Sequence, residues 1–304
     1  MSDAIASMIK FLFELLLGKQ DASGNVTDGI VNGIAYNQLM FKSDWLAPTG
    51  VINQMFSYFA IIGLGFSIIY FLLEINRRYG FEGNDITLKT FGAPLLKFVA
   101  SLIVLMNYSK FVSWILAFHN GIIVKVRGWE FFGTEKPLSA KVSDIVDTIN
   151  NEIVGNLGLL ALLVFMIPLV ACLLVTLICS FVWWYKAIGY KIEFLFRVGL
   201  SPIAAADIYG VGLSSGTMRW LKGLIAMSLY GVAFLLVPKI GMGIVLSDWG
   251  DAVKALRDAA TASGKEELEI LWGVIKAMVQ LIVVPIAEIG VLGAARNATK
   301  EVLS

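Results

Sequence analysis

The sequence predicts an all-α, polytopic integral membrane protein with about five transmembrane helices and additional amphipathic interfacial helices. Of its 304 residues, 58% are hydrophobic and only 15% are charged, and the mean hydropathy is +0.78. A soluble domain is usually about 45–50% apolar and about 25% charged. The apolar residues also cluster in runs close to the roughly 20 residues that a spanning helix needs.

Five segments are long and apolar enough, or nearly so, to span a membrane. The third is the clearest, while the second carries Asn107 and Lys110 near its middle. The expected spans are residues 51–73, 98–118, 157–185, 223–246 and 270–293.

The segments around these spans complete the expected domain organisation. Residues 1–50 form an extracytoplasmic segment with an interfacial amphipathic helix, because apolar residues recur there at helical spacing. Residues 51–293 form the membrane domain, and 294–304 a cytoplasmic tail. The outer loops 119–156 and 247–269 each contain a stretch with one apolar helical face, at 139–155 and 247–264.

Lys and Arg residues predict the orientation of the chain. With the N-terminus outside, the outer segments hold 10 basic residues in 111 positions, and the inner segments hold 11 in 74. Basic residues are enriched in cytoplasmic loops, so we expect the N-terminus outside and the C-terminus in the cytoplasm.

The stretch KIEFLFRVGLSPIAAADIYG, at 191–210, interrupts the apolar pattern after the third span. Four polar residues from 186 to 197 are spaced 4, 3 and 4 apart, which puts them on one face of a continuing helix. Pro202 disfavours helical geometry at Ser201, so the helix should break there, and Ser214 or Ser215 should cap the fourth span. Residues 186–222 are therefore interpreted as a cytoplasmic elbow that either contacts a partner or is merely solvated. Its candidate contact residues are Lys186, Tyr190, Glu193, Arg197, Ser201, Pro202, Asp207, Arg219 and Lys222.

Four polar residues within the expected spans are candidates for a path or an assembly surface, because ionisable groups in a membrane are costly. Lys276 and Glu288 lie toward opposite ends of the fifth span and can either act there or snorkel to the interface. Asn107 and Lys110 either mark a polar interior in an oligomer or show that the second helix ends early.

The sequence contains no motif that points to an enzyme. We find no phosphate-binding loop, nucleotide fingerprint, metal-ligand cluster or nucleophile elbow, so neither catalysis nor a cofactor is expected. The single histidine, His119, falls at an outer span boundary, where a solvated or interfacial role is expected.

Two regions resemble a known family. The run WWYKAIGYKIEFLFRVGLSPIAAADIYGVGLSSGTMRWLKGLIAMSLYGVAFLLV resembles the central region of the TrbL-like (VirB-six-like) inner-membrane subunit of type IV secretion and conjugal transfer systems. The region YFLLEINRRYG…LLKFVASLIVLMNYSKFVSWIL resembles the first hairpin of that family, including a polar break in the second span. The likeness covers roughly residues 50–245 and rests mainly on hydropathy and small or proline positions.

The resemblance implies a helical, homo-oligomeric subunit of the translocation apparatus in the bacterial inner membrane. Its implied partners are other membrane subunits of the apparatus, a cytoplasmic ATPase, phospholipids and the transferred DNA or protein. Two alternatives stay open: a lipid-binding scaffold that encloses no path, and an unrelated small-solute transporter. Against the transporter, five spans do not divide into matched repeats.

Overall fold

The computed structural model describes residues 2–20, 26–28, 36–47, 49–81, 88–127, 159–207, 215–261 and 267–301. These residues are helical almost throughout, which confirms the predicted all-α class. Among them, two short strands, β1 (Gly18–Gln20) and β2 (Val26–Asp28), pair in antiparallel fashion.

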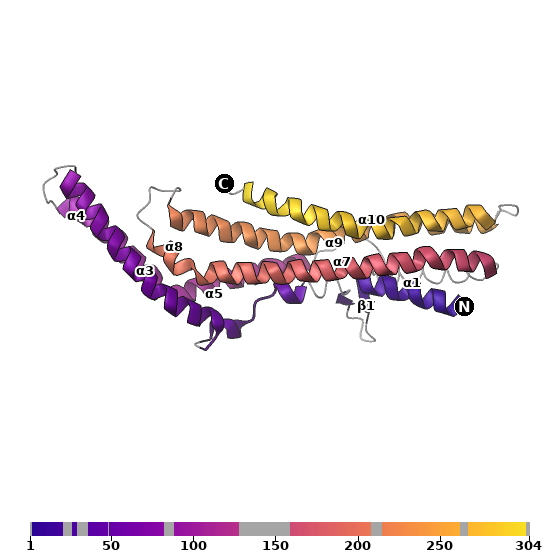
Figure 1. The fold of residues 1–304 in the computed structure, drawn as a ribbon, viewed down its shortest axis with the longest axis horizontal. Coiled ribbons are helices and arrows are strands. Elements are labelled where there is room, and N and C mark those ends of the chain that lie inside the picture. Colours follow the sequence, from indigo (N-terminus) through magenta and orange to yellow (C-terminus); the bar gives the residue numbers. More distant parts are fainter. Residues whose placement is uncertain are drawn as a thin grey trace. The chain divides into compact units, whose positions relative to one another are not determined.

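The helices are coloured along the chain in Figure 1, and several are longer than a bilayer requires. They are α1 (Ser2–Leu17), η1 (Ser43–Leu46), α3 (Val51–Asn76), η2 (Arg77–Phe81), α4 (Leu88–Met106), α5 (Tyr108–Arg127), α7 (Leu159–Gly199), α8 (Ser201–Ala206), α9 (Gly216–Thr261) and α10 (Glu267–Glu301). Within the described residues, four helices are long and apolar enough to cross a membrane, and α4 with α5 makes a fifth if the pair counts as one span.

The chain divides into two compact units. The first contains Met1–Gln38, Lys125–Ile188 and Val232–Ala295, and the second contains Leu39–Val124, Gly189–Gly231 and Arg296–Ser304.

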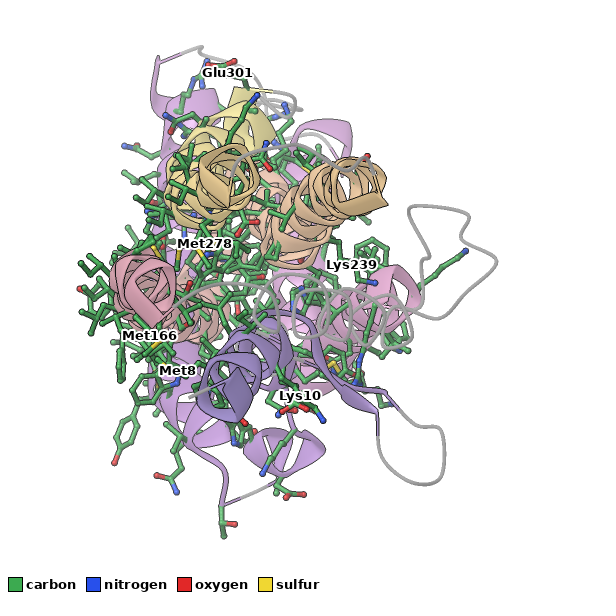
Figure 2. The ribbon with its side chains drawn as sticks, turned by 90° about the vertical axis from the view of Figure 1, so that its right-hand side faces the viewer. Met8, Lys10, Met166, Lys239, Met278 and Glu301 are labelled. Carbon is green, nitrogen blue, oxygen red and sulfur yellow. The ribbon has the colours of Figure 1, made fainter. Side chains whose placement is uncertain are left out.

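In the first unit, parts of α7, α9 and α10 pack along one another. Trp183 of α7 meets Phe234 of α9 edge-on, with ring centroids 5.5 Å apart. Cys172 Sγ of α7 donates to the Met278 carbonyl of α10 at 3.3 Å. Further along α7, Lys186 Nζ donates to the Ile289 carbonyl at 3.0 Å, so residue numbers rise together on α7 and α10. These two helices are therefore parallel, and Figure 2 shows Met166 of α7 and Met278 of α10 on neighbouring helices.

The buried residues of these helices follow helical spacing. On α7 they are Leu169, Cys172, Thr176, Cys179, Trp183 and Ala187, and on α10 they are Met278, Leu281, Pro285, Glu288 and Leu292. The other face of α7 is also apolar but exposed, with Ile167, Val170, Leu174, Ile178 and Phe181. A helix that is apolar all round is typical of a membrane span, so this exposed face suits lipid.

Helix α1 forms where the sequence predicted an amphipathic helix. Its residues Ile9, Leu12 and Leu15 are at most 2% exposed. The protein itself therefore covers this face, and the interfacial placement of the helix stays a prediction.

In the second unit, α3 and α4 form an antiparallel hairpin. Ser67 and Ser101 hydroxyls lie 2.7 Å apart, and the rings of Phe71 and Phe98 stack at 5.0 Å. Ser101 also donates to the Ala205 carbonyl of α8 at 3.3 Å, so Ser67 donates to Ser101. This buried polar chain joins α3, α4 and α8.

The expected second span, 98–118, is not one straight helix. Helix α4 ends at Met106 and α5 begins at Tyr108, and the two are bent by 67°. The Asn107 side chain donates to the Ile103 carbonyl at 3.0 Å, and the Asn107 carbonyl accepts from the amide of Lys110 at 3.1 Å. Asn107 therefore satisfies backbone groups at both helix ends, which favours the interpretation that the helix ends early.

Three other expected boundaries differ from the structure. Residues 247–261 continue α9 instead of forming a separate helix, because no turn follows the fourth span. Residues 294–301 likewise continue α10 rather than forming a separate tail. The expected helix at 139–155 lies outside the described residues.

Candidate functional site at the elbow

The elbow begins where α7 ends at Gly199. Leu200 forms the turn, and α8 starts at Ser201 with Pro202 in its first turn, where a missing N–H costs nothing. The predicted break is confirmed, but Ser201 is helical, so the break falls one residue earlier than expected. Both Ser201 and Pro202 are buried, so neither lies on an open contact surface.

The elbow closes by capping the first turn of α9. Asp207 Oδ2 accepts the Gly216 N–H at 3.0 Å, and Ser215 Oγ accepts the Met218 N–H at 3.2 Å. These bonds satisfy two of the four amides that a helix N-terminus leaves unpaired. Ser215 is thus a cap, as predicted, whereas Ser214 lies outside the described residues. Asp207, expected as a candidate partner contact, is engaged within the elbow.

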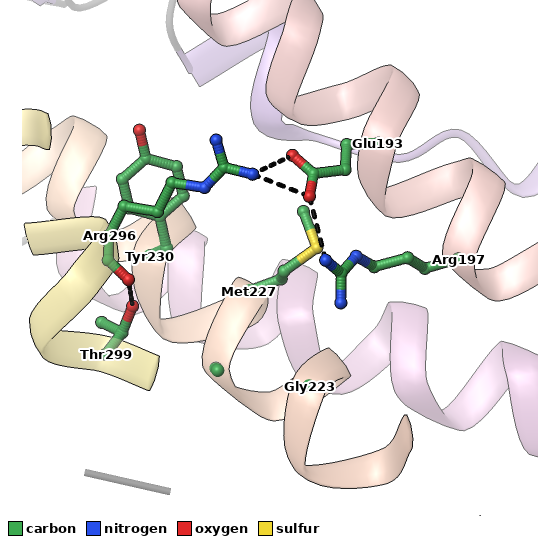
Figure 3. Close-up of a pocket in the computed structure, with 8 residues that line it drawn as sticks. Glu193, Arg197, Gly223, Met227, Tyr230, Arg296 and Thr299 are labelled. Carbon is green, nitrogen blue, oxygen red and sulfur yellow. Dashed lines mark hydrogen bonds and ion pairs between the residues drawn. The ribbon is translucent and has the colours of Figure 1, made fainter. Parts of the chain in front are cut away.

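A charged cluster joins the last turns of α7 to the end of α10. Arg197 Nη2 donates to Glu193 Oε1 at 3.1 Å. Arg296 Nη2 donates to both oxygens of the same carboxylate, at 2.8 and 2.7 Å (Figure 3). The side chains are 33% exposed for Glu193, 39% for Arg197 and 44% for Arg296. Two guanidinium groups share one carboxylate, so the cluster carries a net charge of +1.

A pocket of about 190 Å³ opens beside this cluster. It is lined by Glu193, Arg197, Gly223, Ala226, Met227, Tyr230, Arg296 and Thr299. Figure 3 shows the three charged side chains converging above Met227, with Tyr230 beside Arg296. The pocket therefore combines a cationic side with an apolar wall.

The four polar residues at 186–197 do not form one open face. Tyr190 is 3% exposed and its hydroxyl donates to the Met227 carbonyl of α9 at 3.0 Å, so its expected place on a partner surface is wrong. Lys186 is half-buried and donates to the Ile289 carbonyl. The expectation failed because spacing locates one face of a helix but does not tell whether another helix covers it. Arg219 is exposed and Lys222 half-buried at the start of α9.

His119 lies at the centre of an aromatic cluster. It is fully buried, and its Nε2 donates to the Leu39 carbonyl at 3.1 Å. The rings of Phe41 and Phe194 lie 4.9 and 5.1 Å from the imidazole. The expectation of a solvated or interfacial histidine is wrong, because residues 39–41 fold back over α5.

Glu288 lies on the buried face of α10 and is only 6% exposed. Its carboxylate lies so close to Gly241 of α9 that any side chain at that position would overlap it. Within the described residues, its Oε1 has no hydrogen-bond partner. Glu288 therefore does not snorkel, whereas Lys276 on the same helix is exposed, as are Asn107 and Lys110.

Two charged residues in the structure escaped the sequence reasoning. Arg296 falls in the expected tail at 294–304, whereas in the structure it completes the charged cluster. Lys239 lies inside the expected fourth span, and its Nζ donates to the Val126 and Arg127 carbonyls at the end of α5. A lysine at a helix C-terminus complements the helix dipole. The polarity of Lys239 within an apolar run was the signal that could have identified it.

Fold and site together define an α-helical, multi-pass membrane protein, in which a charged cluster joins the end of α7 to the end of α10 beside the first turns of α9. Comparison with protein-family models, with curated proteins and with solved structures gave no match.

Proposed function

We propose that this chain is a membrane-embedded subunit of a type IV secretion or conjugative DNA-transfer apparatus in the bacterial inner membrane. One observation supports the proposal: in the stretch that carries the family resemblance, the described residues before 208 contact those after 214. Its first half ends α7 and its second half begins α9, and Trp220 Nε1 donates to the Arg197 carbonyl at 3.1 Å across the turn.

In this role the chain forms or supports the inner-membrane path or the platform for pilus assembly. The described residues contain no group of three or more His, Cys, Asp or Glu side chains placed to hold a metal ion.

In the proposed role, a cytoplasmic ATPase supplies the energy for transfer. Arg219 is exposed at the start of α9 and is the proposed contact with that ATPase. The other proposed partners are further membrane subunits and the DNA or protein in transit.

The decisive experiment is transfer from a donor strain that lacks the gene and carries it on a plasmid. Loss of transfer on deletion, restored by the wild-type copy, supports the proposal. Arg219→Glu should reduce transfer at least tenfold while membrane levels of the protein stay constant. Unchanged transfer on deletion, with altered uptake of a small solute, would favour a transporter instead.

We also propose that copies of the chain assemble into a homo-oligomer. Asn107 and Lys110 are exposed at the α4–α5 break, and α3 exposes large apolar side chains such as Ile61 and Leu72. A second copy covers these polar groups better than lipid does. Purification in nanodiscs should give an oligomer, and Lys110→Leu should weaken it. A monomer at high protein concentration would contradict this.

The proposed orientation places the N-terminus outside and the C-terminus in the cytoplasm. Ser143→Cys and Ser263→Cys variants should react in whole cells with a membrane-impermeant thiol reagent, and Ser214→Cys should not. The reverse labelling pattern would overturn the orientation. The alternative of a scaffold without a translocation path predicts the same topology. An image of the purified complex distinguishes the two, because the scaffold would show no water-filled centre.

A further inference from the structure

The pocket beside Glu193, Arg197 and Arg296 has the features of an anion site at the end of the membrane-spanning helices. Both arginines use only Nη2 in their bonds to Glu193. A guanidinium carries five N–H donors in a fixed plane, and Nε and Nη1 of each arginine make none of the bonds to Glu193, so they can donate to a ligand in the pocket that both arginines line. Planar, bidentate donors of this kind match the oxygens of phosphate.

The position of the pocket along the helices indicates whether its anion is a lipid phosphate or a free inorganic ion. Glu193 lies six residues before the end of α7, which is about 9 Å at the rise of an α-helix. Arg296 lies three residues before Thr299, where the apolar part of α10 ends, and Gly223 lies in the second turn of α9. All three helices thus bring the pocket to the same end of their apolar segments, and lipid headgroups meet a spanning helix at such an end.

The lining of the pocket adds a second requirement. Besides the charged groups, it is lined by Ala226 and Met227, whose side chains form an apolar wall. A free inorganic anion would gain nothing from that wall, whereas a lipid would place its glycerol backbone or upper acyl chain against it.

We propose that this pocket binds the phosphate of an anionic phospholipid, with Arg197 and Arg296 as the phosphate ligands. Glu193 acts as an intramolecular competitor that holds both arginines in place when the lipid is absent. The proposal depends on the membrane location of the chain and not on its role in secretion.

The test measures lipid retained by the purified full-length protein, using native mass spectrometry after exchange with phosphatidylglycerol or phosphatidylcholine. The wild-type protein should retain phosphatidylglycerol preferentially. Arg296→Gln and Arg197→Gln should each reduce this preference by about three- to tenfold, since each removes a charge-assisted donor. Glu193→Gln should instead increase it, because the net charge rises to +2 and the competing acceptor is lost.

The chain offers a matched control in the Arg78–Glu74 pair, which joins Nη2 to Oε1 at 3.0 Å and does not line the pocket. Arg78→Gln and Glu74→Gln remove the same charges and should leave phosphatidylglycerol retention unchanged. Thermal unfolding of every variant separates loss of binding from loss of structure.

Three outcomes would overturn the proposal. The first is equal retention of phosphatidylglycerol in Arg296→Gln and the wild type. The second is displacement of the lipid by millimolar inorganic phosphate, which would make the ligand a free anion. The third is a fall in retention with Glu193→Gln in a protein whose thermal unfolding is unchanged, which would mean that the carboxylate supports binding instead of competing.

Discussion

Arg296 of α10 donates from one nitrogen to both carboxylate oxygens of Glu193 in α7, at 2.8 and 2.7 Å, although 103 residues separate them in the chain. Arg197 donates to the same carboxylate from one turn further along α7. The end of α10 is thereby attached to the end of α7, and the two arginines are oriented toward one pocket.

Breaking this contact should cost little stability but should be measurable. Because the two side chains are 44% and 33% exposed, we expect a coupling energy of about 0.2–1 kcal/mol between Arg296 and Glu193. A double-mutant cycle with Glu193→Gln and Arg296→Gln, followed by thermal unfolding in mild detergent, measures it. Raising the salt concentration should shrink the coupling. Strict additivity of the two substitutions would mean that the contact contributes nothing.

Close packing of α3 on α8 should make Gly63 intolerant of a side chain. A Cβ at Gly63 would lie 2.6 Å from the Pro202 carbonyl oxygen, and this backbone atom cannot rotate away. We expect Gly63→Ala to lower the free energy of unfolding by about 1–3 kcal/mol. Gly65→Ala is the matched control, since nothing lies within 4 Å of its Cβ, and it should be neutral or stabilising. Equal stabilities would show that α3 does not rest on α8.

The contact between Glu288 and Gly241 should give a smaller loss that a second substitution relieves. Gly241→Ala would overlap the Glu288 carboxylate, but a side-chain terminus can move more easily than backbone. We expect a loss of about 1 kcal/mol, largely recovered when Glu288→Ala is added. Gly290→Ala on α10, with open space around its Cβ, is the control. If Glu288→Ala does not restore the stability lost in Gly241→Ala, the loss does not come from overlap with the Glu288 carboxylate.

Asn120 should hold residues 39–41 against α5. Its side chain accepts the Phe41 N–H at 3.1 Å and donates to the Phe41 carbonyl at 2.9 Å. Asn120→Ala leaves both groups without these partners, at a cost of about 1–3 kcal/mol. Hydrogen exchange at the Phe41 amide should accelerate, and the exposed Asn297→Ala should leave it unchanged. Asn120→Asp keeps the acceptor, so its exchange rate at Phe41 should lie between those of the wild type and Asn120→Ala. If Asn120→Ala exchanges as slowly as the wild type, Asn120 does not hold this segment.

The sequence by itself determined the membrane class and most of the helices. Long apolar runs identify spans, because only a helix can satisfy every backbone group of a lone segment in lipid. Pro202 and Ser215 identified the elbow, because the geometry of proline and the hydrogen bond of a capping hydroxyl act within a few residues.

Only the tertiary structure decided which face of each helix the protein covers. A membrane helix is apolar on both its lipid face and its buried face, so periodicity could not reveal that Tyr190 and Glu288 point inward while Lys276 points outward. The 67° bend at Asn107 and the contact of Glu193 with Arg296 were likewise beyond the sequence. Hydropathy measures how well a segment suits lipid, whereas the pairing of distant helices depends on shape and polar contacts that no single segment contains.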